Sequence, residues 1–207
     1  MSRPSSGASA AQAPGRGPAE TKDTLGKALI ETRLNEINDA DIKAGLKNLL
    51  LTGADYAVYS QRLAEGTRVE LFQPGDKKGR GVTNINNAKL SSNKAFLVQS
   101  IIILAGVNAD PAADELGKKV DFKPITPEIA NGDITLKNGQ KVFWEDSSLS
   151  VFAHEGNDGL LPGEYKLEVP KMIDPRAELV CDLDLASATA ANTHIKVILK
   201  GTATIKA

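Results

Sequence analysis

The sequence is poor in the residue types that most often carry enzyme chemistry and metal binding. Its 207 residues include one cysteine and two histidines, and aromatic residues make up only 4%. A single cysteine, Cys181, excludes a disulfide within the chain and cannot by itself build a zinc site. His154 and His194 lie too far apart in the sequence to form a local metal motif. We therefore expect a protein that is not an enzyme, holds no cofactor or metal, and is stabilised by packing.

An excess of charge of one sign is also missing. The chain carries 25 Lys and Arg residues against 26 Asp and Glu residues, a formal net charge of -1. This balance gives no strong signal for a nucleic-acid partner or an anionic membrane surface. No apolar run approaches the roughly 18 residues of a transmembrane helix. Residues 1–20 also lack the Leu, Ile, Val and Phe of a signal peptide. We expect no transmembrane segment and synthesis in a cytoplasm.

Three segments differ in composition. Ser, Ala, Pro and Gly fill most of residues 1–20, which predicts a flexible arm. Residues 21–54 have apolar residues at helical spacing, which predicts an amphipathic segment of one or two short helices. Within it, Asn38 to Asp41 break the first helix and cap the second, and Gly53 is expected to close the second. Residues 55–207 are expected to form a single β-sandwich domain.

The apolar face of the helical segment allows two interpretations. The helices can clamp a neighbouring subunit, or they can pack on their own domain, which is the commoner arrangement for amphipathic helices. In the first case the following six residues are the expected subunit contacts: Ile30, Leu34, Ile37, Ile42, Leu46 and Leu49.

From Tyr56 onward, short runs of β-forming residues alternate with turn signals and no helical pattern intervenes. The candidate strands are residues 56–60, 67–73, 95–104, 133–136, 140–144, 148–153, 163–169, 177–185 and 194–205. Asn138-Gly139 is the strongest hairpin signal, since both residues accept the positive φ of a type I′ turn. Residues 95–104 are apolar on both faces, which predicts a covered central strand. The sequence thus predicts a mainly β fold, a jelly-roll-like antiparallel β-sandwich.

Candidate sites for chemistry are few, and each has a plainer interpretation. His154, Glu155 and Asp158 offer metal ligands, but a solvated loop is the simpler reading. Asp182 and Asp184 share a strand face, yet without further oxygen ligands they are expected to be solvated charges.

The same holds for three other features. Cys181 falls on an apolar face, which predicts a buried structural thiol. The basic run Lys77-Lys78-Gly79-Arg80-Gly81 is the one concentrated positive segment; it can touch a phosphate backbone or an acidic neighbour, but without interleaved aromatics a solvated loop is favoured. Trp144 can stack on a sugar or pack in the core, and the core position is favoured.

The order of strands and loops carries a resemblance. The segments concerned are Val69 to Phe72, Gly81 to Asn84, Leu90 to Ile101, Gly163 to Leu167, Ile173 to Pro175 and His194 to Ile205. Their layout resembles that of jelly-roll major coat (capsid) proteins of tailless icosahedral bacteriophages, over about residues 55 to 207. The resemblance implies a structural virion protein that self-assembles, through pentamers or hexamers, into a shell. It brings no catalytic residues.

The expected function is therefore that of a major capsid subunit, located in the virion and made in the host cytoplasm. Its expected partners are copies of itself and other virion proteins. With only Arg3 and Arg16, the arm has too few cations to neutralise a packaged genome. Two alternatives stay open: a non-enzymatic jelly-roll module that binds a carbohydrate-type ligand, with Trp144 exposed, or a minor virion component.

Overall fold

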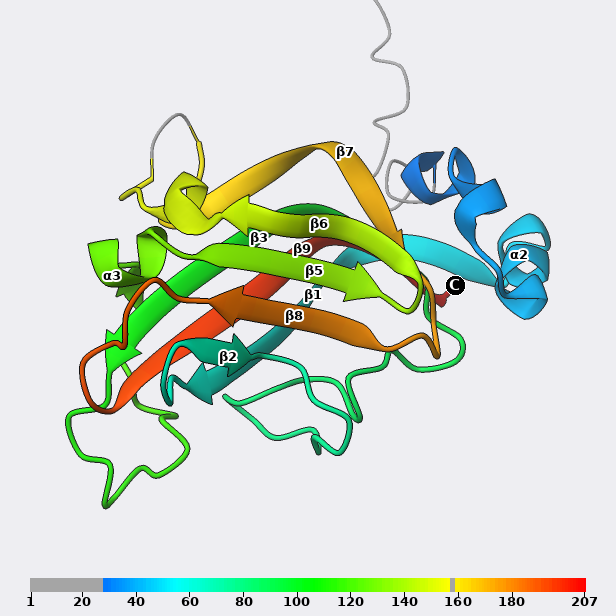
Figure 1. The fold of residues 1–207 in the computed structure, drawn as a ribbon. Helices are drawn as coiled ribbons and strands as arrows, with labels where there is room; N and C mark the ends of the chain where they lie inside the picture. Colours follow the sequence, from blue (N-terminus) through cyan, green and yellow to red (C-terminus); the bar gives the residue numbers. More distant parts are fainter. Residues whose placement is uncertain (1–27, 157–158) are drawn as a thin grey trace, which may run out of the picture.

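The structure, a computed structural model, describes residues 28–156 and 159–207 (Figure 1). The predicted flexible arm, residues 1–20, lies outside the described residues. The strands of the described part are β1 (Leu51–Leu63), β2 (Arg68–Glu70), β3 (Phe96–Val107), β4 (Lys123–Pro124), β5 (Asp133–Asn138), β6 (Lys141–Ser148), β7 (Glu164–Ile173), β8 (Leu179–Asp184) and β9 (Thr193–Lys206). The helices are η1 (Leu34–Glu36), α2 (Ala40–Lys47), α3 (Pro127–Ala130) and η2 (Leu149–Phe152), where η marks a 3₁₀ helix.

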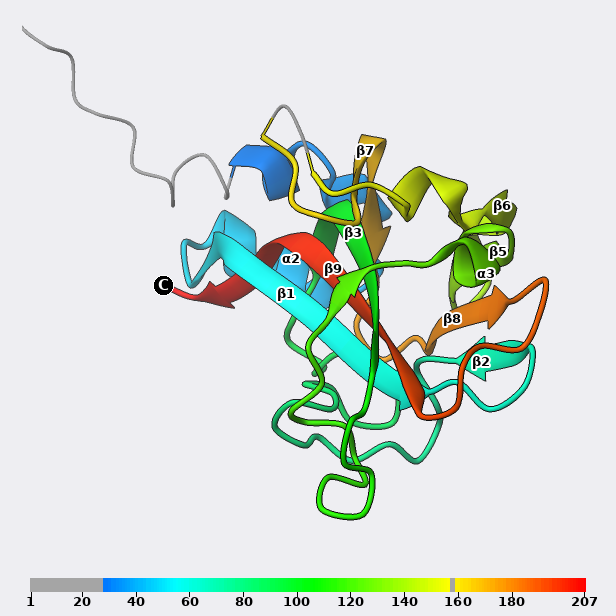
Figure 2. The same ribbon diagram turned by 90° about the vertical axis from the view of Figure 1, so that its left-hand side faces the viewer.

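Eight of these strands pair in a nested order. β5 and β6 form a hairpin, and around it β3 pairs with β7, β2 with β8, and β1 with β9, all antiparallel. Pairing of β9 with β3 and of β8 with β5 joins them into two sheets, β1-β9-β3-β7 and β2-β8-β5-β6, while β4 adds to the end of β3. A hairpin rolled into two packed sheets is a jelly roll. The predicted mainly β, antiparallel sandwich is confirmed (Figure 1 and Figure 2).

The core lies between the two sheets and follows the alternation of the strands. On β8, Leu179, Cys181 and Leu183 are buried, whereas Asp182 and Asp184 lie on the other face. The long β3 is buried along most of its length, because β9 and β7 flank it and both of its faces are covered. The expected central strand is therefore confirmed.

The helical segment packs on the outer face of the β1-β9-β3-β7 sheet. Leu97 on β3 and Met172 on β7 form a second apolar cluster there with the side chains of the helical segment. Four of the six expected subunit contacts are buried in this cluster and Leu34 packs against it in part; the four are Ile30, Ile37, Ile42 and Leu46. The structure thus places these four in the core of their own chain. Leu49 differs, since its side chain is 66% exposed.

Helix α2 begins where the sequence predicts but ends before Gly53, the residue expected to close it. Asp39 Oδ1 accepts hydrogen bonds from the backbone N–H groups of Asp41 and Ile42, which is the expected N-cap. The helix stops at Lys47, and the left-handed position after it is held by Leu49, with φ of 58°, instead of a glycine. Gly53 lies inside β1, so the prediction that it closes the helix is wrong, and the first strand begins at Leu51, not near residue 55.

Two details of the second sheet also differ from prediction. The β5–β6 hairpin forms, but its two loop residues are Gly139 and Gln140, and of these only Gly139 has positive φ. This is the pattern of a type II′ turn, one residue later than expected. Residues 149–152 form the helix η2 and not a strand, because the hydroxyl of Ser148 accepts a hydrogen bond from the backbone N–H of Ser150 and caps a helical turn.

Candidate functional site

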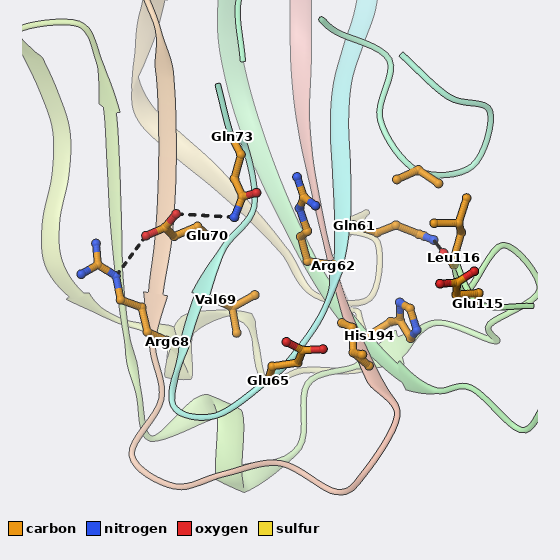
Figure 3. Close-up of a pocket in the computed structure, with 12 residues that line it drawn as sticks. Gln61, Arg62, Glu65, Arg68, Val69, Glu70, Gln73, Glu115, Leu116 and His194 are labelled. Atoms are coloured by element: carbon orange, nitrogen blue, oxygen red, sulfur yellow. Dashed lines mark hydrogen bonds and ion pairs between the residues drawn. The ribbon is translucent and has the colours of Figure 1, made fainter. Parts of the chain in front are cut away.

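Two long loops meet at one end of the sandwich. They are residues 73–90, between β2 and β3, and residues 108–122, between β3 and β4. A hollow of about 510 Å³ opens beside them, lined by the end of β1, by β2, by the start of β9 and by residues of both loops. Figure 3 shows its lining side chains, which come from these separate segments.

Two consecutive residues of β1 hold the two loops. Gln61, which is buried, donates hydrogen bonds from Nε2 to the carbonyl oxygens of Leu116 and Gly117, at 2.9 and 3.0 Å. Figure 3 shows Gln61 beside Leu116. Arg62 forms an ion pair with Asp76 in the other loop. Because adjacent strand residues point to opposite sides, one strand fixes both loops.

His194, the second residue of β9, lies against the second loop. A Cβ placed on Gly117 would lie 2.4 Å from His194 Cε1, so the imidazole occupies the space that a side chain there would need. His194 is only 4% exposed, and its Nδ1 has no hydrogen-bond partner among the described residues. Burial lowers the pKa of His194, and the nearby Asp114 carboxylate opposes this only in part. The ring is therefore held neutral at neutral pH.

Asp114 organises the second loop from within. Its carboxylate accepts hydrogen bonds from the backbone N–H groups of Lys119 and Lys118, at 2.6 and 2.9 Å, and its backbone carbonyl accepts one from Asn108 Nδ2. The hydrogen bond from the Lys119 N–H is the main cause of the lowered pKa of Asp114. The loop thus has a fixed shape, although it contains no regular secondary structure.

The rim of the hollow carries charges of both signs. Arg68 reaches Asp182 on β8 at 2.9 Å and Glu70 at 3.7 Å, and Glu70 also accepts a hydrogen bond from Gln73 at 3.5 Å. The expectation that Asp182 is a solvated edge charge is wrong, because β8 lies between β2 and β5 and the Asp182 side chain, only 16% exposed, pairs with Arg68 across the strands. Such a rim can hold a polar ligand by hydrogen bonds and charge.

A second hollow, of about 670 Å³, lies on the outer face of the β1-β9-β3-β7 sheet. At its base Glu164 is 6% exposed and accepts hydrogen bonds from Ser100 Oγ at 2.6 Å, Lys200 Nζ at 2.9 Å and the Leu161 N–H at 3.0 Å. Burial acts to raise the pKa of Glu164, but these hydrogen bonds outweigh it and keep the pKa below its ordinary value. Glu164 therefore ties three segments together as a carboxylate.

The structure assigns structural surroundings to most other candidate residues. His154 accepts a hydrogen bond at Nδ1 from the Gly156 N–H, and its Nε2 lies 3.0 Å from the Glu164 carbonyl oxygen, so the loop engages both ring nitrogens. Glu155 is exposed and Asp158 lies outside the described residues. Cys181 is fully buried, and burial raises the pKa of its thiol. The buried Cys181 is consistent with the predicted structural thiol, and the hydrogen bonds of His154 are consistent with a loop residue that binds no metal.

Trp144 packs against two other aromatic rings. Its ring centroid lies 5.8 Å from that of Phe152 and 5.1 Å from that of Tyr165. The side chain is partly buried and belongs to the edge of the main core. This is the core position that the sequence favours over a sugar-stacking one.

The sequence did not predict that Lys118 and Lys119 add positive charge beside the basic run. They lie beside the basic run of residues 77–81, because Gly81 packs against Lys118, and a Cβ on Gly81 would lie 3.4 Å from Lys118 Cγ. No local pattern signals this contact, since the two loops are separated by β3.

No known protein family, curated protein or solved structure gives a significant match to this chain. In the part that the structure describes, no helix is long and apolar enough to cross a membrane. Across residues 28–156 and 159–207, no group of three or more His, Cys, Asp and Glu side chains is arranged to hold a metal ion.

Proposed function

We propose that this protein is a non-enzymatic structural virion protein, the major coat subunit of a tailless icosahedral bacteriophage. The observation that carries the proposal is the nested pairing of eight strands into two sheets, one of which also includes β4. This jelly-roll arrangement is used by viral capsid subunits and also by lectins and cupins. In the proposed role, copies of the chain associate into pentamers or hexamers and then into a shell, with other virion proteins as further partners.

An exposed apolar surface offers a place for such subunit contacts. Leu49 and Leu50 are each 66% exposed, and Ile205 is 39% exposed. They lie at one corner, because Leu50 accepts a hydrogen bond from Ala207 and Ile205 pairs with Thr52 across β1 and β9. We call Leu49, Leu50 and Ile205 the corner patch. Exposed apolar side chains that adjoin one another are typical of protein interfaces, and we assign this patch to a second copy of the chain.

The backbone at Leu49 supports a role outside the folding of the single chain. The Leu49 and Leu50 N–H groups donate to the carbonyl oxygens of Leu46 and Gly45, which is the pairing of a Schellman helix end. Glycine is the usual residue at the left-handed position of this motif, and a leucine there costs about 1 to 2 kcal/mol. Neither burial nor packing within the chain offsets that cost, since Leu49 is mostly exposed. A contact with another subunit would offset it.

A ligand-binding module is the second candidate, and the outer-face hollow favours it. That hollow contains Tyr56 together with polar groups such as Gln99 and Lys166. An aromatic ring beside hydrogen-bonding side chains is a combination that suits a carbohydrate-type ligand. Trp144 does not line this hollow, so the binding role would fall to Tyr56.

Size-exclusion chromatography with light scattering, followed by negative-stain imaging, separates the two candidates. A coat subunit gives particles, pentamers or hexamers whose proportion rises with protein concentration. A binding module stays a monomer and binds a glycan in isothermal titration, and replacing Tyr56 with Ala abolishes that binding. A monomer at all concentrations, with or without glycan binding, contradicts the coat proposal.

A further inference from the structure

Five exposed cations gather where the two long loops meet. Lys77, Lys78 and Arg80 lie in residues 73–90, and Lys118 and Lys119 lie in residues 108–122. The contact between Gly81 and Lys118 brings the two groups together at one end of the sandwich. We call these five residues the loop cations. The positive charge is concentrated in residues 77–81, which contain three cations and no carboxylate, in a chain whose net charge is -1. The second loop adds Lys118 and Lys119 but also contains Asp110, Asp114, Glu115 and Asp121.

No loop cation forms an ion pair among the described residues, although the Lys119 charge acts on the Asp114 carboxylate. Cations elsewhere in the described part of the protein are divided between unpaired ones, such as Lys166 and Lys171, and paired ones. Arg62, Arg68 and Lys200, for example, each form an ion pair with an Asp or Glu. None of the ion pairs of the described chain includes a loop cation.

Residues 73–90 and 108–122 also contain five carboxylates. Asp110 accepts a hydrogen bond from the Ala113 N–H, Asp121 pairs with Lys123, and Glu115 is exposed. Asp76 pairs with Arg62 and accepts a hydrogen bond from the Gln73 N–H. Asp114 accepts hydrogen bonds from the backbone N–H groups of Lys118 and Lys119. The ammonium and guanidinium groups of the loop cations are therefore available to an external anion.

Hydrogen bonds fix the backbone of the two loops that carry these cations. Beyond the anchors on Gln61 and Arg62, the Lys78 N–H donates to Asn86 Oδ1 at 2.7 Å and the Gly79 N–H to the Thr83 carbonyl oxygen at 3.0 Å. A fixed backbone reduces the conformational entropy that ordering on a ligand would otherwise cost.

We propose that the loop cations bind the phosphate backbone of a nucleic acid without reading its base sequence. When Lys and Arg side chains neutralise phosphates, counterions condensed on the nucleic acid are released, and this gives affinity without sequence preference. Base stacking is not expected, because residues 73–90 contain no aromatic residue and Phe122, in the other loop, lies beneath Lys196 Nζ at 5.1 Å. This inference concerns a different surface from the corner patch and does not depend on assembly.

A phospholipid surface shares the phosphate chemistry but fits the loops less well. Membrane binding by a protein surface usually requires apolar side chains that enter the bilayer beside the cations. No large apolar residue is exposed in residues 73–90, and Leu116 is the one such residue exposed in residues 108–122. The surface is therefore suited to a polyanion in water.

The test is the binding of the full-length chain to fluorescein-labelled single-stranded oligo-dT, measured by anisotropy over a series of salt concentrations. Five phosphate contacts predict a slope of log Kobs against log salt of about -3.5. In the charge-reversed variant K77E/K78E/R80E, we expect binding to fall at least about tenfold and the slope to drop toward about -1.5. The matched control is K166E/K171E/K206E, which makes the same change in net charge on β7 and β9 and should bind as wild type.

Three results would overturn the proposal. They are failure to bind oligo-dT at low salt, equal loss of binding in both triple variants, and binding to vesicles of phosphatidylglycerol without binding to DNA. Light scattering on the same samples reports assembly separately, so failure of this proposal and failure of the coat proposal can be told apart. Circular dichroism of both variants verifies that they fold.

Discussion

The side-chain amide of Gln61 donates a hydrogen bond of 3.0 Å to the carbonyl oxygen of Gly117. This contact links a buried residue near the end of β1 to the loop that follows β3. The next residue of β1, Arg62, is linked to the other loop by its ion pair with Asp76. The end of the molecule that carries the loop cations is therefore part of the rigid framework and not an appendage.

Replacing Gly117 with Ala should destabilise the protein strongly. Gly117 has φ of 62°, and the new Cβ would lie 2.4 Å from the ring of His194. The backbone term is about 1 to 2 kcal/mol and overpacking adds about 1 to 3 kcal/mol, so we expect a loss of about 2 to 5 kcal/mol in urea unfolding. Gly66→Ala is the control: φ is 84° there but nothing lies within 4 Å of the new Cβ, so only the backbone term applies. Equal losses in the two variants would contradict the packing of His194 on Gly117.

Stability should fall as the pH drops through the range in which a free histidine titrates. The pKa of His194 in the folded chain is below its ordinary value of 6.5, so the unfolded chain binds a proton more readily than the folded one. The stabilisation is fully present above pH 6.5 and is lost as the pH falls from there toward the lower pKa of the folded state. Urea unfolding between pH 5 and 8 measures this. In His194→Gln the decline over this range should shrink, and an unchanged decline would assign it to other groups.

Loss of the Glu164 carboxylate should destabilise the outer face of the β1-β9-β3-β7 sheet. In Glu164→Leu, Ser100 and the Leu161 N–H lose their acceptor and Lys200 loses its ion pair. Hydrogen bonds to charged groups contribute about 1.5 to 3 kcal/mol each, so we expect a loss of about 3 kcal/mol or more. Glu168→Leu, at an exposed position of the same strand, is the control and should change stability by less than about 0.5 kcal/mol.

Because the pKa of Glu164 is lowered in the folded chain, the free energy of unfolding should fall a second time at more acidic pH. The contribution of Glu164 is present above the ordinary pKa of 4.5 and is lost as the pH falls through the lower pKa of the folded state. The wild-type protein should therefore show this loss below about pH 4.5. Its persistence in Glu164→Leu would show that other carboxylates cause it.

Replacing Leu49 with Gly should separate folding from assembly. Glycine relieves the left-handed strain of about 1 to 2 kcal/mol, and this offsets its entropic cost of about 0.5 to 1 kcal/mol. We expect L49G to be at least as stable as wild type in urea, yet to assemble less in light scattering because the corner patch loses a side chain. Leu161→Gly, at another exposed leucine, is the control and should leave assembly unchanged. An L49G variant that assembles like wild type would exclude Leu49 as a subunit contact.

Local patterns in the sequence were sufficient to predict much of the sandwich. Alternation along Leu179 to Leu185 and the double-sided apolar run of residues 95–104 predict which faces are buried. These predictions succeed because burial of a strand depends mainly on period-two patterning. The Asp39 cap is predicted for a similar reason, since a cap is a local hydrogen bond.

The predictions that fail depend on choices between similar local signals or on contacts between distant residues. Gly53 has the residue type of a helix end, but the left-handed residue is Leu49. Asn138 has the residue type of a turn, yet it is buried and accepts a hydrogen bond at its side chain from the Asp174 N–H. The contact of Gly81 with Lys118 joins two loops across β3, and nothing in either loop alone predicts it.

Assembly of the purified full-length chain tests the central proposal most directly. Mass photometry over a range of protein and salt concentrations, with imaging of the largest species, gives the distribution of assembled masses. A coat subunit predicts discrete oligomers or closed shells that are lost when Leu49 and Leu50 are both replaced with Asp. A single species at the monomer mass of 21.9 kDa under all conditions would contradict it.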